Sequence, residues 1–288
     1  MVSQVHLIIL LTLALLLGCR VSPADPSASA GPADLQAQQI TATPEVPTPT
    51  ATAAPAVTSR EAGFSTLAAP SPNFTSSPIP FAKLCSPLAD HPLEILPSII
   101  SDPYDPPPNN QDGRHMGVDF SYYQWGDRDT IQGVAVQSVL SGVVAGAFVS
   151  DAIPYGFAVI IETSLDRLNP QWLNNLETAG HQSIYIQYAH LANPPEVIRG
   201  EDILCGQKIG VVGQTGGEGT PYLIPHLHIE MRLGPAGVRF EEMGYYDTRV
   251  SEQARQTYLR WRLGGEFEHF DPMFILEKGT STSDSLVP

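Results

Sequence analysis

Short apolar runs alternate with turn residues through the second half of the chain. Six of these runs are rich in β-branched and aromatic residues, and Gly, Pro or Asn residues bound them. This pattern is typical of antiparallel strands joined by turns. We therefore expect strands at residues 134–138, 142–148, 158–163, 184–190, 208–212 and 226–233.

Two further segments have the spacing of helices. Residues 169–178 predict a short helix, and residues 250–263 predict a longer one near the C-terminus. The second segment places four apolar side chains on one helical face, which indicates a helix packed against a core: Val250, Ala254, Tyr258 and Trp261.

The N-terminus begins with an apolar run from Leu7 to Leu17 that only Thr12 interrupts. About 20 apolar residues are needed to cross a bilayer, so this run fits the core of a signal peptide better than a membrane span. The ending Leu16-Leu17-Gly18-Cys19 resembles the bacterial lipobox. The resemblance implies a signal peptide over residues 1–18 and a lipid on Cys19. A plain cleaved signal and an uncleaved anchor are the alternatives.

The next segment is dominated by Ala, Pro, Ser and Thr. Eleven of the 27 prolines fall in residues 21–80, and Arg60 is the only Lys or Arg there. Such a composition buries too little apolar surface to offset the loss of backbone entropy. We expect residues 19–80 to be a disordered tether, residues 81–278 to form the folded domain, and residues 279–288 to be a flexible tail.

Charge narrows the range of partners. The chain carries a formal net charge of −15. Binding to nucleic acid needs a Lys/Arg surface, and docking onto anionic lipid head groups needs one as well. We therefore expect no nucleic-acid partner, and membrane attachment through the lipid on Cys19. The sequence leaves the oligomeric state open.

Three cysteines are present, and lipidation would account for Cys19. Cys85 and Cys205 then form an even pair in an oxidising compartment, where a disulfide is expected. Two separate buried thiols are the alternative.

Histidine and aspartate spacing points to a metal. His226 and His228 are two residues apart in a β-prone run, so both rings point to the same face. His115 and Asp119 are also an even number of residues apart. Three histidines and a carboxylate are ligands that zinc prefers, and a catalytic zinc site uses three protein ligands and leaves one position for water. Taken alone, either pair is more often a pair of surface or core residues than a metal site.

Four short segments occur in an order that resembles the lysostaphin/LytM-type zinc metallopeptidase family. The resemblance covers roughly residues 114–232, and a weaker match follows at residues 270–272. The four segments are His115-Met116-Gly117-Val118-Asp119-Phe120, Tyr188-Ala189-His190-Leu191, residues 206–216 with four glycines, and Pro225-His226-Leu227-His228-Ile229-Glu230.

The resemblance implies an all-β fold, an antiparallel barrel-sandwich of the duplicated hybrid motif type, to which this chain adds a C-terminal helix. It implies zinc as cofactor, with His115, Asp119 and His228 as ligands, and His190 and His226 as catalytic residues beside the metal. Which of these two histidines is the general base stays open.

By the same resemblance, the expected activity is hydrolysis of peptide bonds in peptidoglycan stem or cross-bridge peptides, outside the cytoplasmic membrane. One alternative is a non-catalytic scaffold that activates another wall hydrolase. Another is a wall-binding module with a structural zinc.

Three longer loops depart from the family pattern, at residues 165–183, 217–224 and 234–269. Loops around a cleft form its walls, so these segments are expected to reshape the substrate groove. We expect Tyr188 and Tyr222 to line that groove, although a surface loop packed on the core would explain Tyr222 as well.

Overall fold

The computed structural model describes residues 82–108, 111–217 and 224–280. The predicted signal peptide, Cys19, the whole of the predicted tether and Tyr222 lie outside these residues. Residues 281–288 of the predicted tail do so as well.

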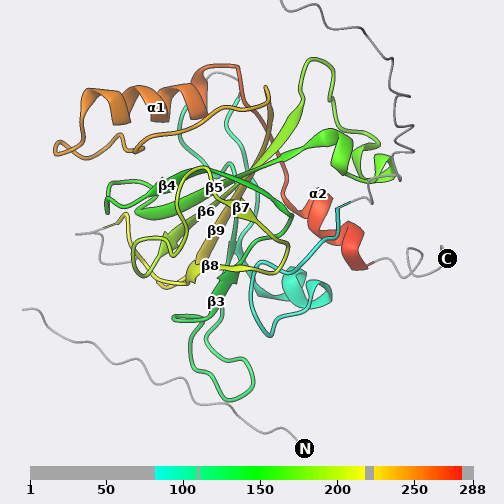
Figure 1. The fold of residues 1–288 in the computed structure, drawn as a ribbon. Coiled ribbons are helices and arrows are strands. Elements are labelled where there is room, and N and C mark those ends of the chain that lie inside the picture. Colours follow the sequence, from blue (N-terminus) through cyan, green and yellow to red (C-terminus); the bar gives the residue numbers. More distant parts are fainter. Residues whose placement is uncertain (1–81, 109–110, 218–223, 281–288) are drawn as a thin grey trace, which may run out of the picture. The chain divides into compact units, whose positions relative to one another are not determined.

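Most of the described chain is one antiparallel sheet (Figure 1). Its strands follow the order β1-β2-β9-β6-β5-β4-β7, and β10 also pairs with β9. The bounds are β1 Ile100–Asp102, β2 Val118–Phe120, β4 Gly142–Phe148, β5 Phe157–Ser164, β6 Ser183–Leu191, β7 Asp202–Ile203, β9 Leu227–Gly234 and β10 Glu268–Phe270. A second sheet joins β3 (Ala135–Gln137) to β8 (Lys208–Val211).

Helical segments are short apart from one. The helix α1 spans Glu252–Leu263 and α2 spans Met273–Leu276. Single-turn or two-turn 3₁₀ segments are η1 Leu93–Ile99, η2 Leu165–Arg167, η3 Pro170–Leu173 and η4 Glu277–Thr280. Among the described residues, no helix is both long enough and apolar enough to cross a membrane.

Apolar residues cover both faces of the large sheet, because successive side chains of its central strands point to opposite faces. On β9, Leu227, Ile229, Met231 and Leu233 point into the larger core, which α2 also joins. The opposite face is covered by a second core to which α1 contributes Tyr258 and Trp261. Figure 1 shows α1 and α2 on different sides of the sheet.

The expected fold class is confirmed: antiparallel β-structure with an added C-terminal helix. Within the described residues, the large sheet is open and does not close into a barrel. All six predicted strands are present, and no boundary differs by more than one residue.

The predicted helix at residues 250–263 begins at Glu252, because the Ser251 hydroxyl accepts a hydrogen bond from the Ala254 amide and so caps it. The helix predicted at residues 169–178 is wrong. Only η3 forms, because Asn174 leaves the helical conformation and Asn175 adopts φ +72°.

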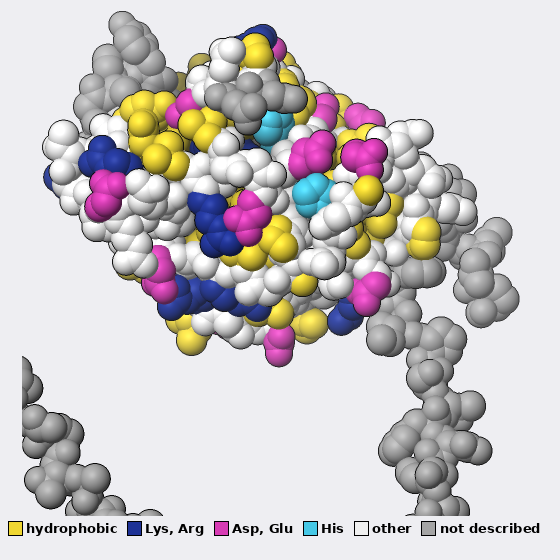
Figure 2. Space-filling model, turned by 90° about the horizontal axis from the view of Figure 1, so that it is seen from above, with side chains coloured by type: hydrophobic (Ala, Val, Ile, Leu, Met, Phe, Trp, Pro, Cys, Tyr) yellow, Lys and Arg dark blue, Asp and Glu magenta, His cyan; other side chains and the backbone are white. Residues whose placement is uncertain are grey.

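Basic and acidic side chains are interspersed on the molecular face seen in Figure 2, where histidine side chains also reach the surface beside acidic ones.

Short strands at the margins, β1, β7 and β10, were not predicted from sequence. Each has only two or three residues, too few for a hydrophobic alternation to be recognised.

Candidate metal centre

Strand pairing brings the predicted ligands together. Asp119 on β2 lies directly opposite His228 on β9. His115 is placed by a separate pair of backbone hydrogen bonds with Asp105. Gly117 permits the close approach, because a Cβ at this position would lie 2.7 Å from the His228 ring.

The three side chains meet at one point. The Asp119 Oδ1 atom lies 2.7 Å from His228 Nδ1 and 3.1 Å from His115 Nε2. The two ring nitrogens are 3.0 Å apart. Within the described residues, this is the group of His, Cys, Asp or Glu side chains whose geometry fits a metal ion.

Hydrogen bonds on the far side of each ring fix which nitrogen faces this point. His115 Nδ1 lies 2.9 Å from the Pro103 carbonyl oxygen, which can only accept, so Nδ1 carries the proton. His228 Nε2 lies 3.3 Å from Glu230 Oε1 and donates to it. In neutral rings, His115 Nε2 and His228 Nδ1 therefore both present lone pairs to Asp119.

Three acceptors facing one another attract positive charge. Burial alone would lower the pKa of His228, but its hydrogen bonds to Asp119 and Glu230 outweigh burial and raise that pKa to about 9. Burial would raise the pKa of Asp119, yet the hydrogen bonds of His115 and His228 hold it well below its ordinary value. An anionic carboxylate and two imidazole lone pairs form a donor set that fits Zn²⁺.

His190 and His226 lie beside this group. Their ring centroids are 4.4 Å apart, and His226 Nε2 lies 3.5 Å from Asp119 Oδ2. His190 Nδ1 donates to the Thr215 carbonyl and His226 Nδ1 to the Ile224 carbonyl, each at 2.7 Å. In neutral rings, Nε2 of both histidines is therefore the nitrogen that carries the lone pair. Burial lowers the pKa of His190 to about 3, so this ring is neutral at pH 7.

His190 has a strained backbone conformation. Its φ is +60°, which a residue with a β-carbon rarely adopts. The amide of His190 donates to the Tyr155 carbonyl at 3.0 Å, and its own carbonyl accepts from the Gly213 amide at 2.9 Å. Strain of this kind is often found where a side chain must be aimed at a site.

All five histidine and aspartate residues line one cleft with a volume of 350 Å³. The same cleft is also lined by Tyr246, Tyr258 and Arg262, which belong to the segment 234–269. The segment 234–269 therefore forms part of the cleft wall, and its effect on the shape of a substrate groove stays a prediction. The segment 165–183 is different: Arg167 and Ser183 line a separate pocket with residues such as Glu162 and Arg239.

Tyr188 does not line the cleft, so this part of the groove prediction is wrong. Its side chain is fully buried in the larger core, and its hydroxyl accepts a hydrogen bond from the Val139 amide at 2.8 Å. The alternation of β6 places Tyr188 on the same face as Ile186, in the larger core, and Ala189 on the opposite face. Tyr155, which sequence reasoning missed, lines the cleft instead.

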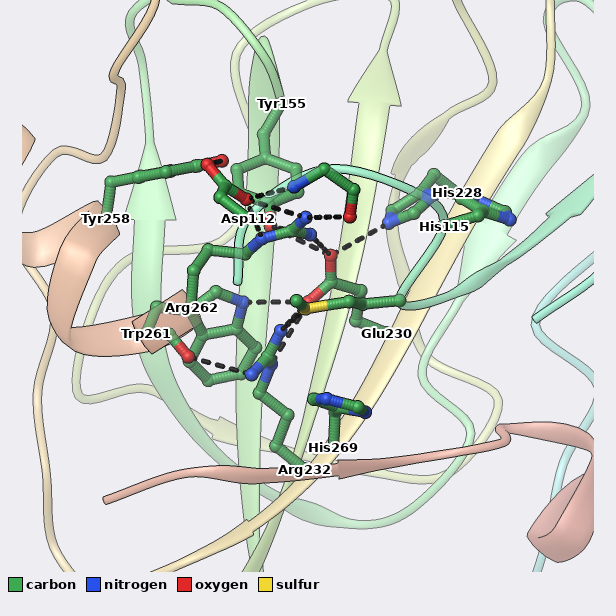
Figure 3. Close-up of polar contacts among 12 residues, drawn as sticks. Asp112, His115, Tyr155, His228, Glu230, Arg232, Tyr258, Trp261, Arg262 and His269 are labelled. Atoms are coloured by element: carbon green, nitrogen blue, oxygen red, sulfur yellow. Dashed lines mark hydrogen bonds and ion pairs between the residues drawn. The ribbon is translucent and has the colours of Figure 1, made fainter. Parts of the chain in front are cut away.

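Glu230 is a second residue that sequence reasoning missed. It is fully buried and bridges His228 to Arg232 and Arg262 (Figure 3). The period of two that places His226 and His228 on one face continues through Glu230 and Arg232. That alternation was the available signal for a polar layer beneath the metal ligands.

The predicted disulfide between Cys85 and Cys205 is present. It links the start of the described chain to the turn before β8, away from the cleft lining. Cys85 and Cys205 are the only cysteines among the described residues.

No model of a known protein family matches the chain, and no curated protein matches it in sequence. Solved structures do. The chain is similar to the antimicrobial peptidase lysostaphin from Staphylococcus simulans, with 20% identity over 66% of this chain and 55% of that one, at a TM-score of 0.35.

The catalytic domain of the prophage-encoded M23 protein EnpA from Enterococcus faecalis is 21% identical, over 50% of this chain and 87% of that one, at a TM-score of 0.32. A zinc-containing peptidase from Vibrio cholerae is 27% identical over 46% of this chain and 33% of that one, at a TM-score of 0.29.

Proposed function

We propose that this chain is a zinc-dependent endopeptidase that hydrolyses peptide bonds in peptidoglycan stem or cross-bridge peptides. One observation carries the proposal. Three atoms that could hold a metal ion, on His115, Asp119 and His228, share one cleft with two further histidines whose Nδ1 atoms donate to backbone carbonyls. A purely structural zinc site would use four protein ligands and would need no neighbouring bases.

The three donor atoms would hold the metal, and the two remaining histidines would accept and donate protons. A bound zinc ion supplies a Lewis acid that polarises the scissile carbonyl and lowers the pKa of water. Nε2 of His190 or His226 accepts a proton from the attacking water as its oxygen bonds to the carbonyl carbon. The resulting imidazolium stabilises the negative charge on the carbonyl oxygen and returns the proton to the amine when the C–N bond breaks.

The substrate class follows from the resemblance of the four sequence segments to lysostaphin/LytM-type peptidases. In addition, Asp112, Tyr246 and Arg262 form part of the cleft wall. These side chains bind one another, so the wall is already built before a peptide enters. A peptide lying between this wall and the histidines would place its carbonyl beside the three ligands.

We further propose that the enzyme acts outside the cytoplasmic membrane and is anchored there by a lipid on Cys19. The support is the lipobox-like ending of the apolar run at residues 7–17 and the absence of any basic excess that would bind anionic lipids. The disulfide between Cys85 and Cys205 agrees with an oxidising compartment. Palmitate labelling of the wild-type chain, lost in Cys19→Ala, tests the anchor.

The test of the enzymatic proposal is zinc content measured together with release of new amine ends from purified peptidoglycan. The full chain in detergent is compared with His190→Ala, which keeps all three ligands. We expect about one zinc per chain in both proteins and amine release by the wild type alone. Zinc without cleavage by the wild type would favour the scaffold alternative, and a wild type without zinc would overturn the ligand assignment.

A further inference from the structure

Beside the three candidate metal ligands and the two further histidines lies a buried carboxylate, that of Glu230. Six donors converge on its two oxygens. Oε2 accepts from Arg232 Nε at 3.1 Å, Arg232 Nη2 at 2.8 Å and Trp261 Nε1 at 3.0 Å. Oε1 accepts from the Tyr155 hydroxyl at 2.8 Å, Arg262 Nη1 at 2.9 Å and His228 Nε2 at 3.3 Å.

One of these donors is a metal ligand. His228 turns Nδ1 toward Asp119 and His115, and its opposite nitrogen, Nε2, donates to Glu230. A histidine that binds metal through one nitrogen is oriented by the acceptor at the other, which also fixes its tautomer. With five other donors on the same carboxylate, Glu230 itself has little freedom to rotate.

The segment 234–269 supplies part of this arrangement. Trp261 and Arg262 lie on α1, and both reach Glu230 from the same side, as Figure 3 shows. Arg262 is held in turn by Asp112, at 3.0 Å between Nη2 and Oδ1. Two carboxylates and two guanidinium groups, those of Asp112, Glu230, Arg232 and Arg262, balance in charge.

The burial of this network depends on α1. Glu230, Arg232 and Trp261 are completely buried, because α1 covers the face of β9 from which Glu230 and Arg232 project. Charge-assisted hydrogen bonds are stronger where water is excluded. The helix therefore stiffens the contact behind His228 and also contributes Tyr258 and Arg262 to the lining of the cleft.

We propose that Glu230 is a positioning residue for the metal ligand His228, and that α1 completes the site by fixing Glu230 through Trp261 and Arg262. This inference rests on the proposed function only in that it requires the three ligands to bind zinc. It predicts that the segment 234–269 affects metal affinity as well as the shape of the groove.

The experiment measures zinc affinity by competition with a chromophoric chelator for the full chain and two variants. Glu230→Gln removes the carboxylate charge behind His228. Glu162→Gln is the matched control, since Glu162 is also largely buried and bound by Arg239 and by the Gly237 amide of the same segment, but touches no metal ligand. Cobalt substitution adds a visible spectrum that reports ligand geometry.

We expect Glu230→Gln to bind zinc about 10 to 100 times more weakly than the wild type, with an altered cobalt spectrum. Glu162→Gln should keep the affinity and spectrum of the wild type. Equal affinities in all three proteins would overturn the positioning role and leave the proposed function intact. A wild type that binds no zinc would overturn both.

If Glu230→Gln fails to fold, the Trp261→Phe variant tests the positioning role of Glu230 instead. This change keeps an aromatic ring in the core and removes one donor to Glu230 Oε2. A folded Trp261→Phe protein with weakened zinc binding and a shifted cobalt spectrum supports the inference. Wild-type affinity and spectrum in that variant would contradict it.

Discussion

His115 Nε2 lies 3.0 Å from His228 Nδ1, although 113 positions separate the two residues in the chain. Neither ring can donate to the other while both are neutral, because the N–H of His115 donates to the Pro103 carbonyl and the N–H of His228 donates to Glu230. Asp119 adds a carboxylate to the same point. Folding therefore brings three acceptors together, and a cation relieves their repulsion.

Zinc is expected to stabilise the folded chain for this reason. A ligand that binds only the native state raises the free energy of unfolding by about 2.7 kcal/mol when its concentration is 100 times its Kd. The midpoint of thermal unfolding should rise with added Zn²⁺ and fall with a chelator. Asp119→Ala should respond to neither, and a wild-type midpoint that is insensitive to zinc would count against the metal centre.

Tyr188→Phe tests the placement of Tyr188 in the core. The Val139 amide would lose its buried acceptor, which costs about 1–3 kcal/mol. Urea unfolding should show that loss, while zinc affinity and the KM for any peptide substrate stay at wild-type values. A raised KM with unchanged stability would indicate that Tyr188 lines the substrate groove and would contradict its placement in the core.

Asp112→Asn tests the wall of the cleft. The Asp112 carboxylate accepts from the hydroxyls of Tyr246 and Tyr258 and from Arg262. Losing its charge should lower the free energy of unfolding by about 1–3 kcal/mol at pH 7. Asp129→Asn, at an exposed position, is the control and should unfold like the wild type.

The effect of Asp112→Asn should also depend on pH. Partial burial would raise the pKa of Asp112, but the hydrogen bonds from the two tyrosines and the charge of Arg262 lower it below its ordinary value. A lowered pKa contributes stability above the unfolded-state pKa of about 3.9, and the contribution is lost as pH falls through the folded-state pKa. The difference between wild type and variant should therefore shrink below about pH 4; a constant difference would mean that the charge plays no part.

The disulfide should contribute strongly to stability because its cysteines are 120 residues apart. In the simplest model, cross-linking a loop of this length lowers the entropy of the unfolded chain and so raises the free energy of unfolding by about 4–5 kcal/mol. A chain carrying both Cys85→Ser and Cys205→Ser should unfold at lower urea concentration and still bind zinc, since neither residue lines the cleft. Loss of zinc binding in the folded double variant would contradict this separation.

The local pattern of apolar and polar residues, with the spacing of His and Asp residues, was enough to predict much of the fold and of the site. Six strands and the helix α1 follow from hydrophobic periodicity, which depends only on near neighbours in the chain. The spacing of His226 and His228 and of His115 and Asp119 indicated which side chains share a face. The chemistry of these residue types then suggested zinc.

Only the tertiary structure decided what surrounds them. Strand order places β2 next to β9, and so Asp119 opposite His228; no local pattern contains that pairing. Likewise, α1 covers β9 and delivers Trp261 and Arg262 to Glu230, while the alternation of β6 sends Tyr188 into the core. Near neighbours determine the conformation of a segment, but contacts between distant segments depend on how whole faces bury their apolar surface, and that is a property of the complete chain.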